Sequence, residues 1–291
     1  MEKNSGIYNS SRARASLFVS RGFAYLVLIL LAFFSLFPFY LLLVNASRAH
    51  PDILKGFSIS FGSWFSRNFK GMISQPVTPI LSGIKNSLIV SGGVAVLSCY
   101  FSALTAHAIH SYNFRLKHAA FVFIIGIMII PTQVSAPGFV QLVSKLKLNN
   151  SFIPLIVPAI ASPVTVFFMK QYMEGALPLE IVEAARIDGS NEFRTFNLIV
   201  LPIMKPALAV QAIITFIGSW NNYFVPALIL ETDNMKTVPI VIAQLRSADF
   251  VKFDMGILYM TIAAAIVPIV IVYFILSKYI VQGVAMGSVK G

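Results

Sequence analysis

Long stretches without any charged side chain are the feature of this sequence that most restricts its fold. Each is longer than the ~18 to 20 apolar residues that a helix needs to cross a bilayer core. Their continuous apolar character differs from the alternating pattern of outer-membrane strands, which excludes a barrel. The stretches without Asp, Glu, Lys or Arg are 22–47, 86–114, 118–144, 148–169, 206–230 and 255–277. We therefore predict an all-α, polytopic membrane protein with six transmembrane helices, at about 23–46, 86–111, 118–142, 152–172, 205–230 and 256–281.

Composition agrees with a membrane location. The 291 residues are 57% hydrophobic and 11% charged, whereas soluble domains carry about 25% charged residues. The formal net charge of +11 comes from basic residues flanking the apolar stretches, so membrane topology explains it and nucleic-acid binding is excluded. The only cysteine, Cys99, has no partner for an intrachain disulfide and no metal-ligand spacing, so we interpret it as a packing residue.

Basic residues around the first predicted span indicate its orientation. A basic leader, residues 1–22, contains Lys3, Arg12, Arg14 and Arg21, whereas only Arg48 flanks the other end of the span. The positive-inside rule then places the leader in the cytoplasm. With six spans, both termini are cytoplasmic in a multi-pass protein of the cell membrane. The expected organisation is a single transmembrane domain, 23–283, a cytoplasmic tail, 284–291, and outward-facing segments at 45–85, 145–152 and 231–254.

The first outward segment contains an aromatic, amphipathic piece, FSISFGSWFSRNF, from Phe57 to Phe69. Its Trp64 and phenylalanines suit the membrane–water interface. The same pattern fits a helix packed under a partner protein. The sequence leaves both interpretations open.

One charge-rich segment lies between the fourth and fifth predicted spans: Leu177 to Pro202, LPLEIVEAARIDGSNEFRTFNLIVLP. Pro178 suits the first turn of a helix, whose N-terminus favours the carboxylates that follow. Gly189 predicts a left-handed helix stop, and Ser190 or Asn191 predicts the cap of a second helix, which Pro202 is expected to end. The pattern predicts a helix, a sharp turn and a second helix.

Two small residues of the first predicted helix, Ala184 and Ala185, would let another surface approach its backbone closely. Charged residues surround this bare patch, namely Glu180, Glu183, Arg186 and Asp188. The segment therefore has the character of a docking site for another protein.

The same segment resembles the EAA signature of the membrane permease subunits of bacterial ABC importers. The matching residues, at the spacings of that signature, are Glu183, Ala184, Ala185, Gly189, Ile199, Leu201 and Pro202. The segments EAARIDGS, at 183–190, and GVAMGSVKG, at 283–291, resemble those of the carbohydrate-uptake (MalG-like) branch of that family. The looser resemblance extends from about Asn86 to Gly291.

This resemblance implies the type I ABC importer permease fold, in which the loop between helices 4 and 5 forms a coupling helix on a separate ATPase. The implied partners are a second homologous permease subunit, two ATP-binding ATPase subunits and an extracytoplasmic solute-binding protein that delivers a sugar or oligosaccharide. ATP and Mg would be bound by the ATPase subunits, and no cofactor by this chain. The tail, 283–291, resembles the family tail that extends toward the ATPase pair. Transport by alternating access is expected.

The residues themselves do not point to an enzyme. The Lys236-Thr237 pair lacks the preceding glycine of a Walker A loop, and neither HExxH nor GxSxG occurs. His107 and His110 have a helical spacing that suits a metal, but no carboxylate or thiol lies beside them in the sequence, so we interpret them as interface residues.

A polar segment in the fifth predicted span, which begins at Ser219, is the candidate substrate contact. Its candidate residues are Trp220, Asn221, Asn222 and Tyr223. Amides hydrogen-bond sugar hydroxyls, and aromatic faces stack on sugar rings. Interhelical hydrogen bonding is the alternative interpretation. Gln133, after Pro131, is a weaker candidate for the substrate path. Prolines in spans three to six predict broken helices, of the kind that line a translocation path.

Two other functions fit six apolar spans. An ion-coupled secondary transporter is expected to place an ionisable group inside the membrane, and none of the six apolar stretches contains Asp, Glu, Lys or Arg. An ABC importer permease for a solute other than a sugar stays open as well.

Overall fold

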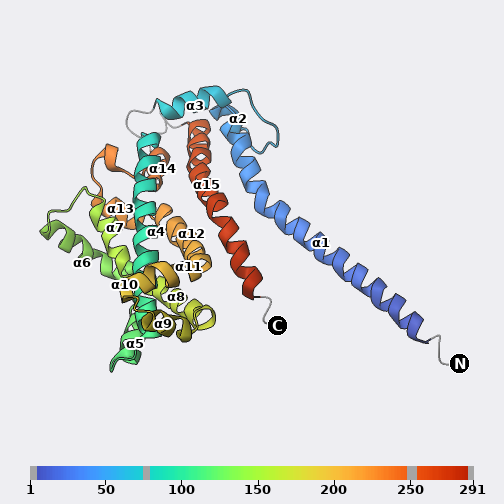
Figure 1. The fold of residues 1–291 in the computed structure, drawn as a ribbon. Helices are drawn as coiled ribbons and strands as arrows, with labels where there is room; N and C mark the ends of the chain where they lie inside the picture. The colour runs from blue at the N-terminus through green and yellow to red at the C-terminus, as the bar shows by residue number, and fades with distance from the viewer. Residues whose placement is uncertain (1–4, 75–78, 248–253, 288–291) are drawn as a thin grey trace. The chain divides into compact units, whose positions relative to one another are not determined.

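The computed structural model describes residues 5–74, 79–247 and 254–287, with side chains between residues 20 and 278 of these ranges. All regular structure in them is helical (Figure 1). The stretches long and apolar enough to cross a membrane are Ser20–Ala46 in α1 (Ser5–Ala46), α4 (Ile80–Ser111), Ile153–Ala176, and Met255–Lys278 in α15 (Met255–Gly287). Two bent helix pairs bring the number of candidate spans to six. The predicted all-α, multi-pass fold is confirmed.

The span predicted at 118–142 is not one straight helix. It consists of α5 (Lys117–Ile127) and α6 (Thr132–Lys145), bent by 96°. Pro131 lies immediately before α6 with an extended backbone, because a proline cannot donate the hydrogen bond that would continue α5. The proline-induced break is confirmed.

The span predicted at 205–230 is also broken. Helix α12 (Lys205–Trp220) ends at Asn221, and α13 (Phe224–Ile229) is a separate short helix. The break falls before Pro226, which lies in the first turn of α13, where a missing N–H is tolerated. Adjacent asparagines favour turns over helix, because their amides compete for backbone groups. The predicted break is confirmed, but it lies at the asparagines and not at the proline.

Pro202 does not end the second helix of the 177–202 loop. The helix runs through α10 (Glu192–Thr195), a π-helical turn η2 (Phe196–Val200) and α11 (Leu201–Ile203). A bend of 80° to α12 follows at Met204. A widened turn before Pro202 relieves the clash of its ring with the preceding turn, so the helix continues past the proline.

The chain divides into two compact units, residues 1–71 with 254–263 and residues 72–253 with 264–291. The first contains α1, α2 (His50–Leu54), most of α3 (Phe65–Ile73) and the start of α15. The predicted single domain, 23–283, includes most of both units. Residues 5–22 of the predicted leader belong to α1 and 284–287 of the tail to α15, while 1–4 and 288–291 lie outside the described residues. Cytoplasmic placement of the termini stays a prediction.

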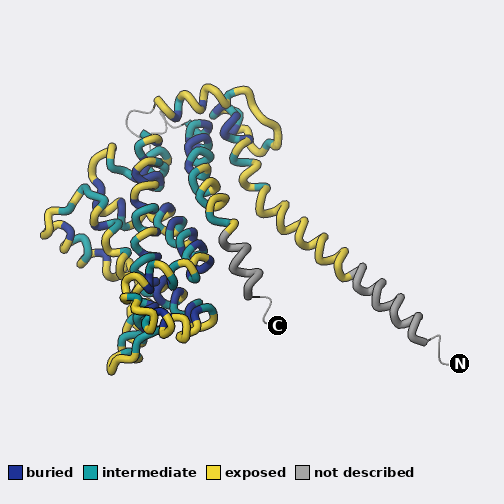
Figure 2. The backbone as a smooth tube through the Cα atoms, viewed as in Figure 1, coloured by how far each residue is buried: buried dark blue, intermediate teal, exposed yellow. Residues whose placement is uncertain are grey.

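In the second unit α4 is the central helix, and it packs against α8 (Pro163–Ala176), the 3₁₀ turn η1 (Val157–Ile160), α12 and α14 (Val238–Arg246). Figure 2 shows buried residues along α4, and most of these are small. They include Ser91, Ala95, Ser98, Cys99, Ser102, Ala103 and Ala106. Because such side chains let helices approach closely, this row explains the central position of α4. Cys99 is a packing residue, as predicted.

Candidate functional site

The turn at Gly189 ends α9 (Leu179–Ile187) with a complete Schellman motif. Gly189 has a φ of +77°. The Ser190 N–H donates to the Ala185 carbonyl (3.0 Å) and the Gly189 N–H to that of Arg186 (3.0 Å). These two bonds satisfy the last carbonyls of the helix. The predicted left-handed stop is confirmed.

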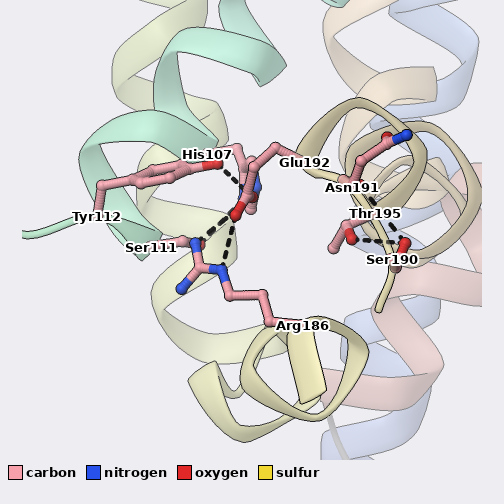
Figure 3. A network of polar contacts seen from close by, with 8 residues as sticks. All are labelled: His107, Ser111, Tyr112, Arg186, Ser190, Asn191, Glu192 and Thr195. Atoms are coloured by element: carbon pink, nitrogen blue, oxygen red, sulfur yellow. Dashed lines mark hydrogen bonds and ion pairs between the residues drawn. The ribbon is translucent and has the colours of Figure 1, made fainter. Parts of the chain in front are cut away.

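Asn191 caps the next helix. Its Oδ1 accepts a hydrogen bond from the Arg194 N–H at 2.8 Å, so Asn191, rather than Ser190, is the N-cap of α10. The Ser190 hydroxyl instead accepts one from the buried Thr195 hydroxyl at 3.0 Å. The predicted helix, turn and helix are confirmed, and side-chain bonds within the turn (Figure 3) define the relation between its two helices.

An ion pair closes the turn and attaches it to α4 (Figure 3). Arg186, on α9, donates from Nε to Oε1 of Glu192, on α10, at 2.8 Å. Tyr112, which follows α4, donates its hydroxyl to the other oxygen of Glu192. The Arg186 guanidinium lies 5.0 Å from the Tyr112 ring centroid, within cation–π range. The hydrogen bonds from Arg186 and Tyr112 lower the pKa of Glu192 below its ordinary value.

Two histidines of α4 contact this region, and among the described residues they belong to no group of three His, Cys, Asp or Glu side chains that could hold a metal ion. The His110 ring donates from Nε2 to the Leu177 carbonyl at 3.0 Å, which attaches α4 to the start of the loop. His107 Nδ1 lies 3.0 Å from the Ser111 hydroxyl, and its ring packs at 5.7 Å from the Phe196 ring. The interpretation of both as interface residues is confirmed.

The loop rests on a hydrophobic core. Phe196 is fully buried, and its ring meets that of Tyr100 edge-on, at 5.6 Å. Val182, from α9, belongs to the same cluster as residues of α4, α8 and α12. The Tyr100 hydroxyl also donates to Asn197 Oδ1 at 3.3 Å. These contacts hold the 177–202 loop as a packed cap on α4, so it is not a flexible linker.

The predicted docking residues fall on different faces of this cap. Ala184 is exposed, but Ala185 is buried, so only one alanine is available to a partner. Exposed carboxylates without an ion pair among the described residues are Glu180, Glu183 and Asp188, whereas Arg186 is paired with Glu192. Ile199 and Leu201 are half-buried, Leu201 against the core cluster, and Pro202 is exposed.

Sequence reasoning missed two apolar side chains that flank the Gly189 turn. Ile187 is 86% exposed and Phe193 is 72% exposed. Large apolar groups this far out of a core indicate a contact surface for lipid or protein. The signal available in the sequence is that Ile187 and Phe193 lie on either side of Gly189, which predicts a helix stop.

A second candidate site is a cavity of about 180 Å³ beside the break between α12 and α13. Its polar lining residues are Ser87, Ser91, Ser219, Asn222 and Thr237, and none of its lining residues is charged. The hydroxyls of Ser91 and Thr237 are buried and have no hydrogen-bond partner among the described residues. Buried polar atoms are normally satisfied, so unpaired hydroxyls at a cavity indicate space for a hydrogen-bonding guest, such as water or a solute hydroxyl.

The other predicted substrate-path residues do not reach this cavity. Trp220 is only 2% exposed, and its ring stacks on Phe216 at 5.6 Å, which makes it a core residue of α12. Asn221 and Tyr223 are exposed at the break, and Gln133 is exposed at the start of α6. None of the four lines the cavity. Of the predicted polar segment and Gln133, only Asn222 and the preceding Ser219 line it.

Helix α4 connects the two candidate sites. Near its start, the Asn86 amide donates to the carbonyls of Asn234 and Lys236, and the Ser87 hydroxyl accepts from the Val238 N–H. Its other end carries the bonds to the 177–202 loop. At 1.5 Å per residue, about 30 Å of continuous helix separates Ser91 from Ser111. A displacement of the loop can therefore reach the cavity through one rigid element.

Comparison with known proteins gives concordant results. The family model described as "Binding-protein-dependent transport system inner membrane component" matches residues 98–286. The chain is 34% identical to the arabinooligosaccharides transport system permease protein AraQ of Halalkalibacterium halodurans, over 93% of this chain and 95% of the relative. It is 30% identical to the trehalose/maltose transport system permease protein MalG of Thermococcus litoralis, over 90% and 94%.

The fold is similar to that of a solved structure. The match is to a bacterial ABC transporter involved in the import of the acidic polysaccharide alginate, with a TM-score of 0.75 and 18% identity. It covers 96% of this chain and 98% of that one. This likeness supports the predicted type I permease fold.

Proposed function

Because the chain belongs to the family of binding-protein-dependent transport system inner membrane components, we propose that it is one permease subunit of an ATP-driven importer of a sugar or oligosaccharide. Family membership favours this function over the ion-coupled carrier. The names of the relatives support a sugar substrate. The uncharged, hydroxyl-rich lining of the cavity agrees with a neutral solute.

The observation that carries the coupling role is the packed cap formed by the 177–202 loop. It presents Ile187 and Phe193 outward beside the carboxylates Glu180 and Glu183, while its inner face is bonded to α4. An apolar tip with a charged rim is the usual anatomy of a protein interface. The proposed partner on this face is an ATPase subunit, which binds ATP and Mg; this chain supplies the docking surface.

The proposed mechanism is alternating access driven from this loop. Closure of the ATPase pair moves the cap as a unit, because the Schellman turn and the Arg186–Glu192 pair prevent its two helices from moving independently. Helix α4 carries the displacement to Ser91 and the cavity beside Asn222. The breaks in α5–α6 and α12–α13 give the bundle places to bend without disrupting packed helices.

The remaining assignments complete this proposal. A second homologous permease subunit completes the path, and an extracytoplasmic binding protein delivers the solute. Both termini lie in the cytoplasm, with 45–85, 145–152 and 231–254 outside. Substrate contact is assigned to Asn222 in the cavity, with Asn221 and Tyr223 at the exposed break. The tail, 283–291, is assigned to contact with the ATPase pair because its sequence resembles the family tail.

Uptake by the reconstituted transporter tests the function. Vesicles containing this chain, its partner permease and the ATPase subunits are supplied with binding protein, external solute and internal ATP. Arabino-oligosaccharide, trehalose and maltose are compared with an amino acid. ATP-dependent accumulation of a sugar is expected, and no uptake when the ATPase subunits are omitted. Uptake of the amino acid alone would contradict the sugar assignment but leave the permease role intact.

A further inference from the structure

The segment that follows the first span folds back onto the end of that span. The Trp64 N–H donates to the Ser47 carbonyl at 2.8 Å, and the Gly62 N–H to the Ser47 hydroxyl at 2.8 Å. The buried side chain of Asn68, in α3, donates to the carbonyls of Ala46 and Arg48 at 2.8 and 2.9 Å. Since Ala46 is the last residue of α1, these bonds hold α3 at the depth where that span leaves the membrane.

The start of α15 lies at the same place. A Cβ on Gly256 would be 2.6 Å from Nδ2 of Asn68 and 2.7 Å from the Arg48 carbonyl oxygen, so the glycine allows an approach that no other residue would. The Met255 N–H donates to His50 Nδ1 at 3.1 Å. Two membrane-spanning helices therefore have their ends at Asn68, and α3 is attached to both.

Helix α3 has one face that nothing in its own unit covers. Phe65, Phe69 and Ile73 recur every four residues, lie on one side of the helix and are exposed. Arg67 lies on the opposite side of the helix, Lys70 lies on the flank next to Ile73, and the helix contains no acidic residue. An apolar stripe opposite basic residues is the pattern of helices that lie in the plane of a membrane interface.

Aromatic rings of the segment before α3 pack on α1 near its end. Tyr40 packs edge-on against Phe61 at 5.7 Å and donates its hydroxyl to the Ile59 carbonyl. Phe37 lies 6.5 Å from Phe57. A group of exposed aromatic side chains at the end of a span is typical of the boundary between acyl chains and headgroups.

We propose that α3 is an interfacial helix that binds the phospholipid bilayer at the end of the first span. Phe65 and Phe69 insert among the upper acyl chains, while Arg67, 4.1 Å above the Trp64 ring, and Lys70 face the headgroup phosphates. The helix anchors the ends of α1 and α15 at one membrane depth. Between the two interpretations of 57–69, the bonds of Asn68 to the end of α1 and its contact with Gly256 at the start of α15 favour lipid over a partner protein.

Nitroxide depth measurements test this proposal in the assembled transporter. The partner subunits are made cysteine-free and Cys99→Ala is introduced. Single labels are then placed by Phe69→Cys on the apolar side of α3 and by Arg67→Cys on the opposite side. The complex is reconstituted in vesicles of phosphatidylethanolamine and phosphatidylglycerol. Collision with oxygen, which concentrates in lipid, is compared with collision with a water-soluble nickel chelate.

The label at position 69 is expected to collide more with oxygen, and the label at position 67 more with nickel. Equal nickel access at both positions would overturn the proposal, as would a label at position 69 shielded from both reagents, the result for a protein partner. A second measurement needs no label: brominated phospholipids should quench fluorescence in the wild-type complex more than in the Trp64→Phe complex. Equal quenching would also overturn it.

Discussion

Arg186 and Glu192 join the two sides of the Gly189 turn, with Nε of one 2.8 Å from Oε1 of the other. They are six positions apart in the sequence. The Tyr112 hydroxyl, which follows the end of α4, donates a further hydrogen bond to the Glu192 carboxylate. The pair therefore has two roles: it fixes α10 relative to α9, and it attaches both to the central helix.

The first prediction concerns the backbone of Gly189. A Cβ there would meet nothing within 4 Å, so any effect of a substitution comes from the positive φ alone. Gly189→Val is expected to introduce strain of about 1–3 kcal/mol and to tilt α10 against α9, which lowers uptake per ATP hydrolysed. Gly189→Asn is the matched control, since asparagine tolerates this conformation. Uptake and hydrolysis are measured side by side in vesicles with all subunits; normal coupling in the valine variant would show that the turn does not transmit.

The second prediction concerns the charge network. Since the pKa of Glu192 is lowered in the folded protein, its stabilising contribution is fully present above the ordinary carboxyl value of 4.5 and is lost as the pH falls through the lowered value. The melting temperature of wild-type protein should therefore fall more steeply below about pH 4.5 than that of Glu192→Gln. The difference is small because the pair is largely exposed. Parallel curves for the two proteins would contradict the prediction.

The third prediction distinguishes the exposed charge of Glu183 from the ion pair between Arg186 and Glu192. Glu183→Ala removes an exposed carboxylate that has no ion pair among the described residues, so it should weaken ATPase binding mildly and leave the melting temperature unchanged. Ile187→Ser and Phe193→Ser should weaken binding more, because they remove the apolar tips. Affinity is measured by titrating ATPase onto permease in detergent. Wild-type affinity in both serine variants would place the docking surface elsewhere.

The fourth prediction assigns the solute contact to Asn222. Asn222→Ala should lower uptake while assembly and basal hydrolysis stay normal, because it removes hydrogen-bonding capacity from the cavity. Asn221→Ala should lower uptake less than Asn222→Ala, since Asn221 is exposed at the same break but does not line the cavity. Trp220→Ala, by contrast, should destabilise the chain by about 3–5 kcal/mol, as expected for a buried aromatic ring. Uptake that is unaffected by Asn222→Ala would assign the contacts to the partner permease.

The fifth prediction concerns orientation. With Cys99→Ala as background, Asp188→Cys should react with an impermeant maleimide only in inside-out vesicles, and Lys145→Cys only in intact cells. Both positions are exposed, so access to the side chain does not limit either reaction. Labelling of Asp188→Cys from outside intact cells would reverse the topology.

Much of this protein follows from local sequence. Continuous apolar stretches determine membrane helices because the bilayer admits few alternatives, and the small residues of α4 predict its close packing. Gly189 and Asn191 determine the turn because backbone conformation and capping depend on neighbours only a few residues away. The helix, turn and helix of the 177–202 loop were identifiable for that reason.

The tertiary structure decided everything that depends on distant residues. Trp220 and Asn222 are two positions apart and belong to the same predicted substrate-contact segment. Nevertheless, Trp220 stacks on Phe216 in the core, whereas Asn222 lines a cavity formed with α4 and Thr237. Likewise, the sequence predicts Arg186 as a charge on the docking surface, and only the fold brings Glu192 and the Tyr112 ring beside it. Periodicity describes the faces of one helix, but which face meets another helix depends on packing across the whole bundle, which no local pattern encodes.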